Sequence, residues 1–140
     1  MDHSDEDIIA SMMVTGHRAA RLLESRLDTG VSAGEAVLLR VLDRGPATMS
    51  EIMATLHIRA STATSLVSRL VDAGYATRGH KPGDRRFRVI ALSEAGRDAV
   101  ALISPTFDEI NSALAAASRT SAVHGYRSLV STLSDIESID

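Results

Sequence analysis

Residues 57–88 combine small hydroxyl side chains with arginines in a pattern suited to binding an anionic polymer. This segment holds seven Arg or Lys residues against two acidic residues, a net charge of +5, whereas the whole chain carries −3. Clustered positive charge attracts a phosphate backbone whatever the net charge of the protein. The segment therefore predicts a local contact with a polyanion. Its order of elements, a helix followed by a hairpin with Arg at the tip, indicates double-stranded DNA.

The helix expected from about Arg59 to Ala73 has one polar face made of small hydroxyls. Its hydroxyl residues are Ser61, Thr62, Thr64, Ser65 and Ser68. At helical spacing, the opposite side carries Ala63, Leu66, Val67 and Leu70. Such a face can approach a major groove closely, form hydrogen bonds with base edges or phosphates, and touch a thymine methyl group. The alternative is an ordinary solvated helix face.

The predicted hairpin joins two strand-like runs, residues 75–80 and 86–92, through residues 81–85, where Pro82-Gly83 suits a tight turn. Guanidinium groups at such a tip can reach a minor groove, and narrow A·T-rich grooves attract Arg. We expect Asp84 to orient Arg86 through a bidentate pair and Arg86 to insert. The alternative is a solvated charged turn. Together, the candidate DNA-binding residues are Arg59, Ser61, Thr62, Thr64, Ser65, Ser68, Arg85, Arg86 and Arg88.

Five further helices should hold this segment in place. An amphipathic helix is expected over residues 5–28, with Ser4 as its N-cap. A capping box at Ser32/Glu35 predicts a helix that ends near residue 43, and a second box at Thr48/Glu51 predicts a helix over 49–55. The short turns between these helices and the helix that follows indicate a helix-turn-helix. Ser93 should cap a helix over 94–117, kinked or restarted at Pro105, before a last helix over 121–137. In the second strand, one face should carry Phe87, Val89 and Ala91, alternating with Arg86, Arg88 and Ile90.

Residues 31–97 resemble the multiple antibiotic resistance regulator (MarR) family of bacterial winged-helix regulators. The resemblance lies in three stretches: I-R-A-S-T-A-T-S-L-V-S-R-L-V-D-A-G-Y-A-T-R over residues 58–78, P-G-D-R-R over 82–86, and L-S-E-A-G-R over 92–97. It implies a homodimer whose recognition helices read a near-palindromic duplex and whose wings reach the flanking minor grooves. It also implies repression by promoter occlusion, often relieved by a small ligand.

Two features of the sequence depart from what the family pattern implies. Arg59 stands where the family usually has Ser, Thr or Asp, so either Ser61 caps a slightly later helix start or Arg59 contacts phosphate or base. The chain has no cysteine, which excludes the family's thiol-based peroxide sensing and any disulfide or thiolate site. Arg69 interrupts the apolar side of the helix and indicates either a structural ion pair or a phosphate contact.

The composition narrows the function classes. There is no run of 18 apolar residues and the N-terminus is acidic, so we expect a cytoplasmic protein without a membrane segment. The five histidines show no ligand spacing, and no nucleophile, phosphate-loop or dinucleotide motif is present, so we expect no metal, no cofactor and no enzymatic activity. His17 could line an effector pocket, but an exposed or structural histidine is the commoner case.

The expected fold is mainly α, an α+β winged helix in one MarR-type domain over residues 1–140. The helix-turn-helix core and two-stranded β wing occupy about 31–97, and the dimerisation helices about 5–28 and 98–138. The terminal helices carry more apolar surface than one small domain can bury, which favours a homodimer over a self-contained monomer. The predicted function is a sequence-specific regulator of transcription, most simply a repressor. A winged-helix protein-interaction module is the alternative, and a metal-sensing winged helix is disfavoured by the absent Cys.

Overall fold

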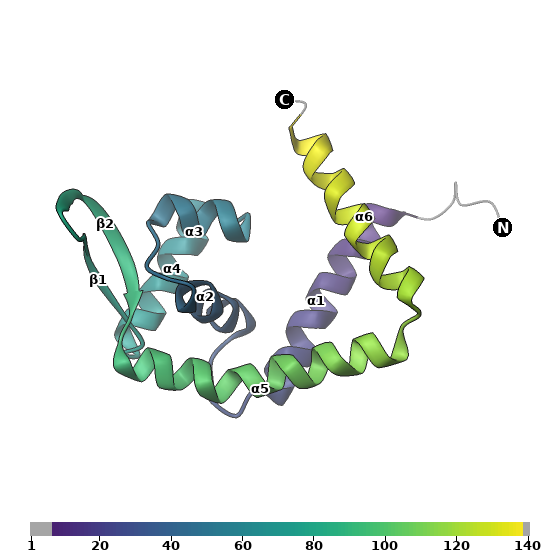
Figure 1. Ribbon diagram of the computed structural model, residues 1–140, viewed down its shortest axis with the longest axis horizontal. Helices are drawn as coiled ribbons and strands as arrows, with labels where there is room; N and C mark the ends of the chain where they lie inside the picture. Colours follow the sequence, from purple (N-terminus) through teal and green to yellow (C-terminus); the bar gives the residue numbers. More distant parts are fainter. Residues whose placement is uncertain (1–6, 139–140) are drawn as a thin grey trace. The chain divides into compact units, whose positions relative to one another are not determined.

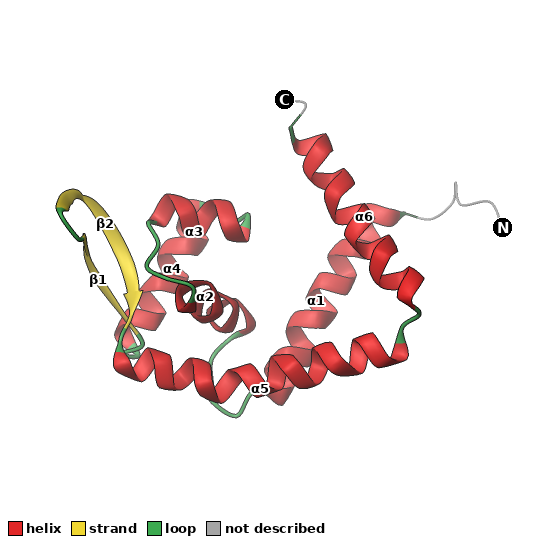
Figure 2. Ribbon diagram, in the orientation of Figure 1, coloured by secondary structure: helices red, strands yellow, loops and turns green. Residues whose placement is uncertain are grey.

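The computed structural model of the chain describes residues 7–138, which separate into two compact units, one ending at Thr106 and the other beginning at Phe107. The elements are α1 (Ile8–Arg26), α2 (Ala33–Asp43), α3 (Met49–Leu56), α4 (Ala60–Asp72), β1 (Ala76–Lys81), β2 (Asp84–Leu92), α5 (Glu94–Ala117) and α6 (Thr120–Glu137). Figures 1 and 2 show a mainly helical chain interrupted by one β hairpin, as the sequence predicted.

Side-chain caps fix where the first three helices begin. Asp7 caps α1 by accepting a hydrogen bond from the Ala10 amide at 3.1 Å, whereas the predicted cap, Ser4, lies outside the described residues. At α3 the full capping box forms, because Thr48 accepts from the Glu51 amide at 3.1 Å and Glu51 accepts from the Thr48 amide at 3.0 Å. These bonds satisfy amide groups that a helix start leaves without an intrahelical partner.

The box predicted at α2 forms only in part. Ser32 accepts a hydrogen bond from the Glu35 amide at 3.2 Å, but the Glu35 carboxylate faces Arg69 instead of returning to the cap. A residue of α1 completes the helix start, since Glu24 accepts from the Ala33 amide at 2.8 Å. This contact attaches α1 to the start of α2.

The core of the first unit is aliphatic. Its most deeply buried large side chains are Leu38, Leu39, Ile52, Val67, Leu70 and Ile103. They come from α2, α3, α4 and α5, and full burial of each stabilises the fold by about 1.5–3 kcal/mol. The residues that hold α4 in place are therefore the ones its apolar pattern predicted, Ala63, Leu66, Val67 and Leu70.

The link between α4 and the hairpin is tightly packed. Gly74 adopts a left-handed conformation (φ 81°) that ends α4, and the Tyr75 amide donates to the Leu70 carbonyl at 2.8 Å. The Tyr75 carbonyl then accepts from the Ser93 amide at 3.0 Å. Gly96, in the first turn of α5, lies so close to that carbonyl that a Cβ atom at this position would overlap it. Only glycine fits there without displacing the base of the hairpin.

β1 and β2 are antiparallel and are joined by Pro82-Gly83, with Gly83 at φ 83°. The turn is shorter than predicted, because Lys81 and Asp84 already belong to the strands. The prediction that Phe87 shares an inner face with Val89 and Ala91 is wrong. Ile90 is the buried residue of β2, whereas Phe87 is 51% exposed. Ile90 is buried because its backbone pairs with Ala47, in the loop between α2 and α3, which brings this part of the strand onto the helices.

The remaining helices bury few side chains within the described chain. α5 runs continuously through Pro105, so of the two predicted effects of this proline, a kink or a restart, the restart is wrong. α6 has no buried residue, and α1 buries only Leu23. The exposed large apolar side chains of these two helices are Ile8, Ile9, Met13, Val14, Leu22, Val123, Tyr126, Leu129, Val130 and Ile136. So much exposed apolar surface is typical of helices that pack against another molecule.

Candidate nucleic-acid interface

The outer face of α4 carries the predicted hydroxyl groups. Ser61, Thr62, Thr64 and Ser65 are exposed, and Ser68 is half-buried. The apolar residues between them point into the core, so the helix is anchored on one side and presents small polar groups on the other. Hydroxyls of this size let the helix backbone approach a partner closely while still offering donors and acceptors.

The start of α4 has no side-chain cap. Arg59 occupies the N-cap position in an extended conformation (φ −74°, ψ 159°) and makes no capping hydrogen bond with its side chain. The helix begins at Ala60, so the alternative in which Ser61 caps a later start is wrong. The exposed Arg59 side chain therefore stands at the positive end of the helix, where anions bind favourably.

His57, which sequence reasoning left among unassigned histidines, shapes the turn before α4. It has the one positive φ (52°) of any non-glycine residue in 7–138 and forms the C-cap of α3. Asn, Asp and His tolerate this left-handed conformation better than β-branched residues do. The turn sets the direction in which α4 leaves α3.

At the hairpin, Asp84 holds Arg86 in the bidentate arrangement that the sequence suggested. Arg86 Nε donates to Asp84 Oδ1 at 3.1 Å, and Nη2 donates to Oδ2 at 3.2 Å. The Arg86 amide also donates to Oδ1 at 3.0 Å. These bonds to the Arg86 side chain and backbone lower the pKa of Asp84 below its ordinary value of 3.8. The Arg86 side chain nevertheless remains 87% exposed, so its guanidinium is both oriented and accessible.

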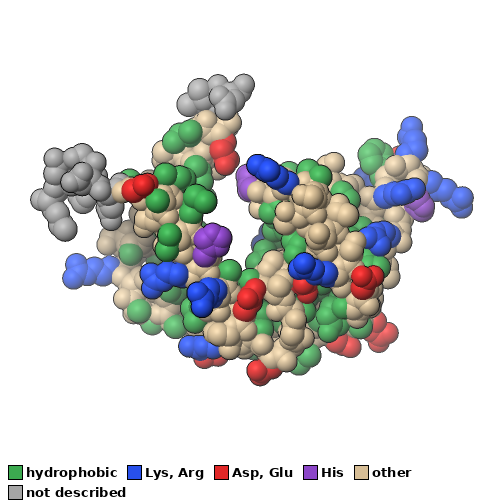
Figure 3. All heavy atoms as spheres, turned by 180° about the vertical axis from the view of Figure 1, so that it is seen from behind, with side chains coloured by type: hydrophobic (Ala, Val, Ile, Leu, Met, Phe, Trp, Pro, Cys, Tyr) green, Lys and Arg blue, Asp and Glu red, His purple; other side chains and the backbone are tan. Residues whose placement is uncertain are grey.

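Other basic residues surround this pair. Arg85 and Arg88 are exposed, and the Lys81 ammonium lies 5.8 Å from the centre of the Phe87 ring. A lysine at that distance attracts the negative face of the ring and covers part of the exposed aromatic. In Figure 3 the Lys and Arg side chains gather over the hairpin, at the right-hand end of the view.

Arg69 forms an ion pair with Glu35 within the fold. Its Nη1 lies 3.7 Å from Oε1 of Glu35 on α2, which supports the structural ion pair over the phosphate contact. The pair joins α4 to α2 and explains why a charged residue can interrupt the apolar side of the helix.

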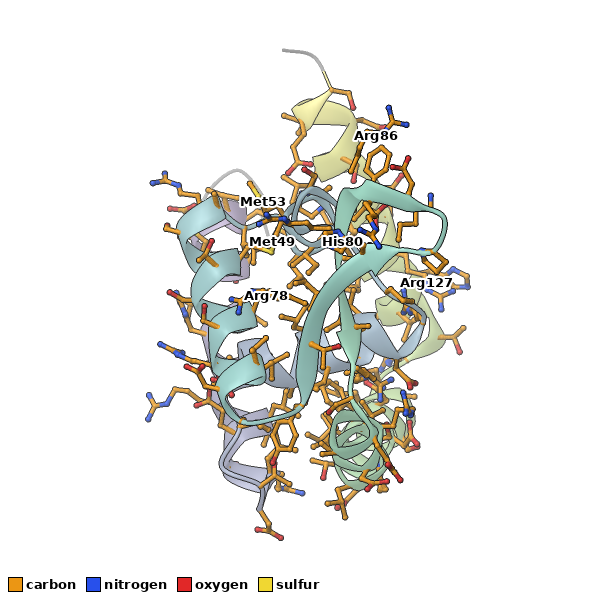
Figure 4. All side chains as sticks on the ribbon, turned by 90° about the vertical axis from the view of Figure 1, so that its left-hand side faces the viewer. Met49, Met53, Arg78, His80, Arg86 and Arg127 are labelled. Atoms are coloured by element: carbon orange, nitrogen blue, oxygen red, sulfur yellow. The ribbon has the colours of Figure 1, made fainter. Side chains whose placement is uncertain are left out.

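Arg78 was not among the candidate DNA-binding residues predicted from the sequence. From β1 its Nη2 donates a hydrogen bond to the Ser68 hydroxyl of α4 at 3.2 Å. Figure 4 shows Arg78 between the hairpin and the helix. The sequence signal was its place in the basic segment, but only the folded hairpin shows that Arg78 reaches back to α4.

Two other kinds of site are absent from the described residues. Within 7–138, no group of three or more His, Asp or Glu side chains is placed to hold a metal ion. No helix in that range has both the length and the apolar character needed to cross a membrane.

A sequence model described as the MarR family matches residues 29–86. An uncharacterised HTH-type transcriptional regulator of Bacillus subtilis, YpoP, is 35% identical over 71 residues, 50% of this chain and 50% of that protein. The chain thus matches about half the length of this relative. A probable transcriptional regulator from Pseudomonas aeruginosa has a TM-score of 0.79 at 25% identity, covering 92% of this chain and 98% of its own.

A second solved structure shares the fold. It is BpsR of Bordetella bronchiseptica, whose DNA binding is regulated by 6-hydroxynicotinic acid. Its TM-score is 0.79 at 20% identity, covering 96% of this chain and 98% of its own.

Proposed function

We propose that this chain, whose residues 29–86 match the MarR family of transcriptional regulators, binds duplex DNA as a homodimeric repressor. In this proposal α4 of each copy enters a major groove of a near-palindromic operator, and each wing reaches the adjacent minor groove. Half-sites read by the two helices of a dimer lie about one helical turn, ~34 Å, apart. Occupation of such a site would block a promoter.

The observation that carries the proposal is the pairing of Asp84 with Arg86 on the hairpin that follows the hydroxyl face of α4. A bare arginine at a hairpin tip would sample many rotamers, whereas Asp84 restrains this one through both carboxylate oxygens. Restraint lowers the entropy that must be lost on binding. The side chains proposed to contact DNA are Arg59, Ser61, Thr62, Thr64, Ser65, Ser68, Arg85, Arg86 and Arg88.

The proposed dimer uses the terminal helices, about residues 5–28 and 98–138. Support comes from the exposed apolar side chains of α1 and α6, which water would cover in a monomer. Burying them between two copies would stabilise the assembly by about 25 cal/mol per Å² of apolar surface removed from water. A second copy also supplies the second recognition helix that a palindromic site requires.

We further propose that a small effector releases the repressor from DNA. The support is the regulation of DNA binding by 6-hydroxynicotinic acid in BpsR, a protein of the same fold. A screen for small molecules that dissociate the complex with the operator would identify the chemical class of the effector.

The test is a fluorescence-anisotropy titration with a duplex from the region upstream of the gene, against a scrambled duplex, at two salt concentrations. The expected result is tighter binding to the upstream duplex, with log Kd rising steeply with log salt, by about 0.9 per neutralised phosphate. Equal binding to both duplexes would leave a DNA binder without operator specificity at this site. No binding to either duplex at low salt would refute the proposal and favour a protein-interaction module.

A further inference from the structure

We propose that Arg78 and Ser68 together bind one phosphate of the DNA backbone at the junction between α4 and the wing. This inference rests on the proposed function and adds a contact to it. The two residues come from different elements, and the hydrogen bond from Arg78 Nη2 to the Ser68 hydroxyl brings their polar groups to within 3.2 Å of each other. Where a helix occupies a major groove and a wing the next minor groove, the strand between them passes this junction.

The strand register explains why Arg78 faces the helix. In the antiparallel hairpin, Arg78 is paired with Ile90, and directly opposed residues project to the same face of a sheet. Ile90 is buried against the helices, so Arg78 projects to that side as well. The next pair on this face is His80 with Arg88, both exposed. A basic strip therefore continues from Ser68 along the inner face of the wing.

The hydrogen-bond chemistry of the pair suits an anion. A serine hydroxyl has one O–H donor and two acceptor positions, and Arg78 occupies an acceptor position. The Ser68 proton is then available to an oxygen outside the pair. Arg78 has five N–H donors, and within the described chain Ser68 is its one hydrogen-bond partner. An oxygen acceptor between the two side chains could receive hydrogen bonds from both, as a phosphate does.

The surroundings favour an anion over a purely structural role. Arg78 is exposed and no acidic side chain of the described chain pairs with it, in contrast to Arg69, which pairs with Glu35, and Arg86, which pairs with Asp84. A guanidinium that only braced the fold would be expected to have a carboxylate partner. A neutral hydroxyl partner orients Arg78 but leaves its positive charge uncompensated.

The test compares wild type, Arg78→Ala and Ser68→Ala by anisotropy titration over a salt series, with upstream and scrambled duplexes. Arg44→Ala is the matched control, since it removes the same charge from an exposed residue at the end of α2, outside α4, the hairpin and the proposed dimerisation helices. Arg78→Ala should weaken binding to both duplexes on the order of tenfold, because phosphate contacts carry no sequence information. The log–log salt slope should become shallower by about 1.8, because the variant dimer loses one phosphate contact, worth about 0.9, in each half-site. Ser68→Ala should cost about threefold.

A second measurement locates the contact. Upstream duplexes carrying one neutral methylphosphonate at a time should show which phosphates the wild type needs. Arg78→Ala should lose its sensitivity at one position in each half-site and keep it elsewhere. An unchanged salt slope and an unchanged methylphosphonate profile in Arg78→Ala would overturn the inference and leave DNA binding itself intact. If the wild type binds neither duplex, the proposed function fails first.

Discussion

Removing the Arg86 guanidinium should weaken operator binding while leaving the fold intact. The side chain is 87% exposed and its hydrogen bonds are to Asp84, so Arg86→Ala disturbs no core contact. Of its five N–H donors, two are engaged by the Asp84 carboxylate and three remain for a minor groove. A well-placed Arg contact contributes about 1–3 kcal/mol, so Kd should rise by about 5- to 150-fold at fixed salt.

The role of Asp84 can be separated from that of Arg86 by a double-mutant cycle. Asp84→Asn keeps the shape but removes the charge that pairs with the guanidinium. Ordering a free arginine on binding costs about 0.5–1.5 kcal/mol, so this variant should lose roughly 2- to 10-fold in affinity. Because Asp84 acts through Arg86, the double variant should bind no more weakly than Arg86→Ala alone.

The assay is anisotropy titration with the upstream duplex, with circular dichroism to verify folding and Arg44→Ala as the charge control. An unchanged Kd for Arg86→Ala would refute the wing contact. Additive losses in the double variant would show that Asp84 acts on binding independently of Arg86, and the orienting role would have to be abandoned.

Three further predictions concern the fold and the wing. Gly96→Ala would force a Cβ atom against the Tyr75 carbonyl and should destabilise the protein by about 1–3 kcal/mol. At Gly16 in α1 an added Cβ meets nothing within 4 Å, so Gly16→Ala should stabilise the protein by about 0.5–1 kcal/mol. Equal melting temperatures for the two variants would contradict both expectations. Thr48→Ala removes half of the α3 capping box and should cost about 1 kcal/mol, a fall in Tm of roughly 3 °C by thermal melting. Asp84 should titrate below 3.8 by NMR, and Arg86→Ala should return it toward that value. Since the folded-state pKa is the lowered one, the pair stabilises the wing at neutral pH and this stabilisation disappears as pH falls through that pKa; an unshifted titration would rule out the pair in solution.

Much of the winged helix could be predicted because its signals are local. Thr48 and Glu51 are three residues apart, and a capping box needs nothing more distant. The two faces of α4 follow from helical spacing alone, and the Asp84–Arg86 pair spans two residues. The error in β2 arose because a distant segment decides which residue is buried. Ile90 is buried because it pairs with Ala47, which no alternation within β2 could reveal.

By itself, the sequence determined the order of helices and hairpin, the hydroxyl face of α4, the arginines of the wing and the family resemblance, because these depend on neighbours within a few residues. The tertiary structure decided which face of β2 is buried, that Glu24 caps α2, that Arg69 pairs with Glu35, and that Arg78 reaches Ser68. Each of these contacts joins two elements, and the distance between two side chains on separate elements is set by core packing rather than by their spacing along the chain.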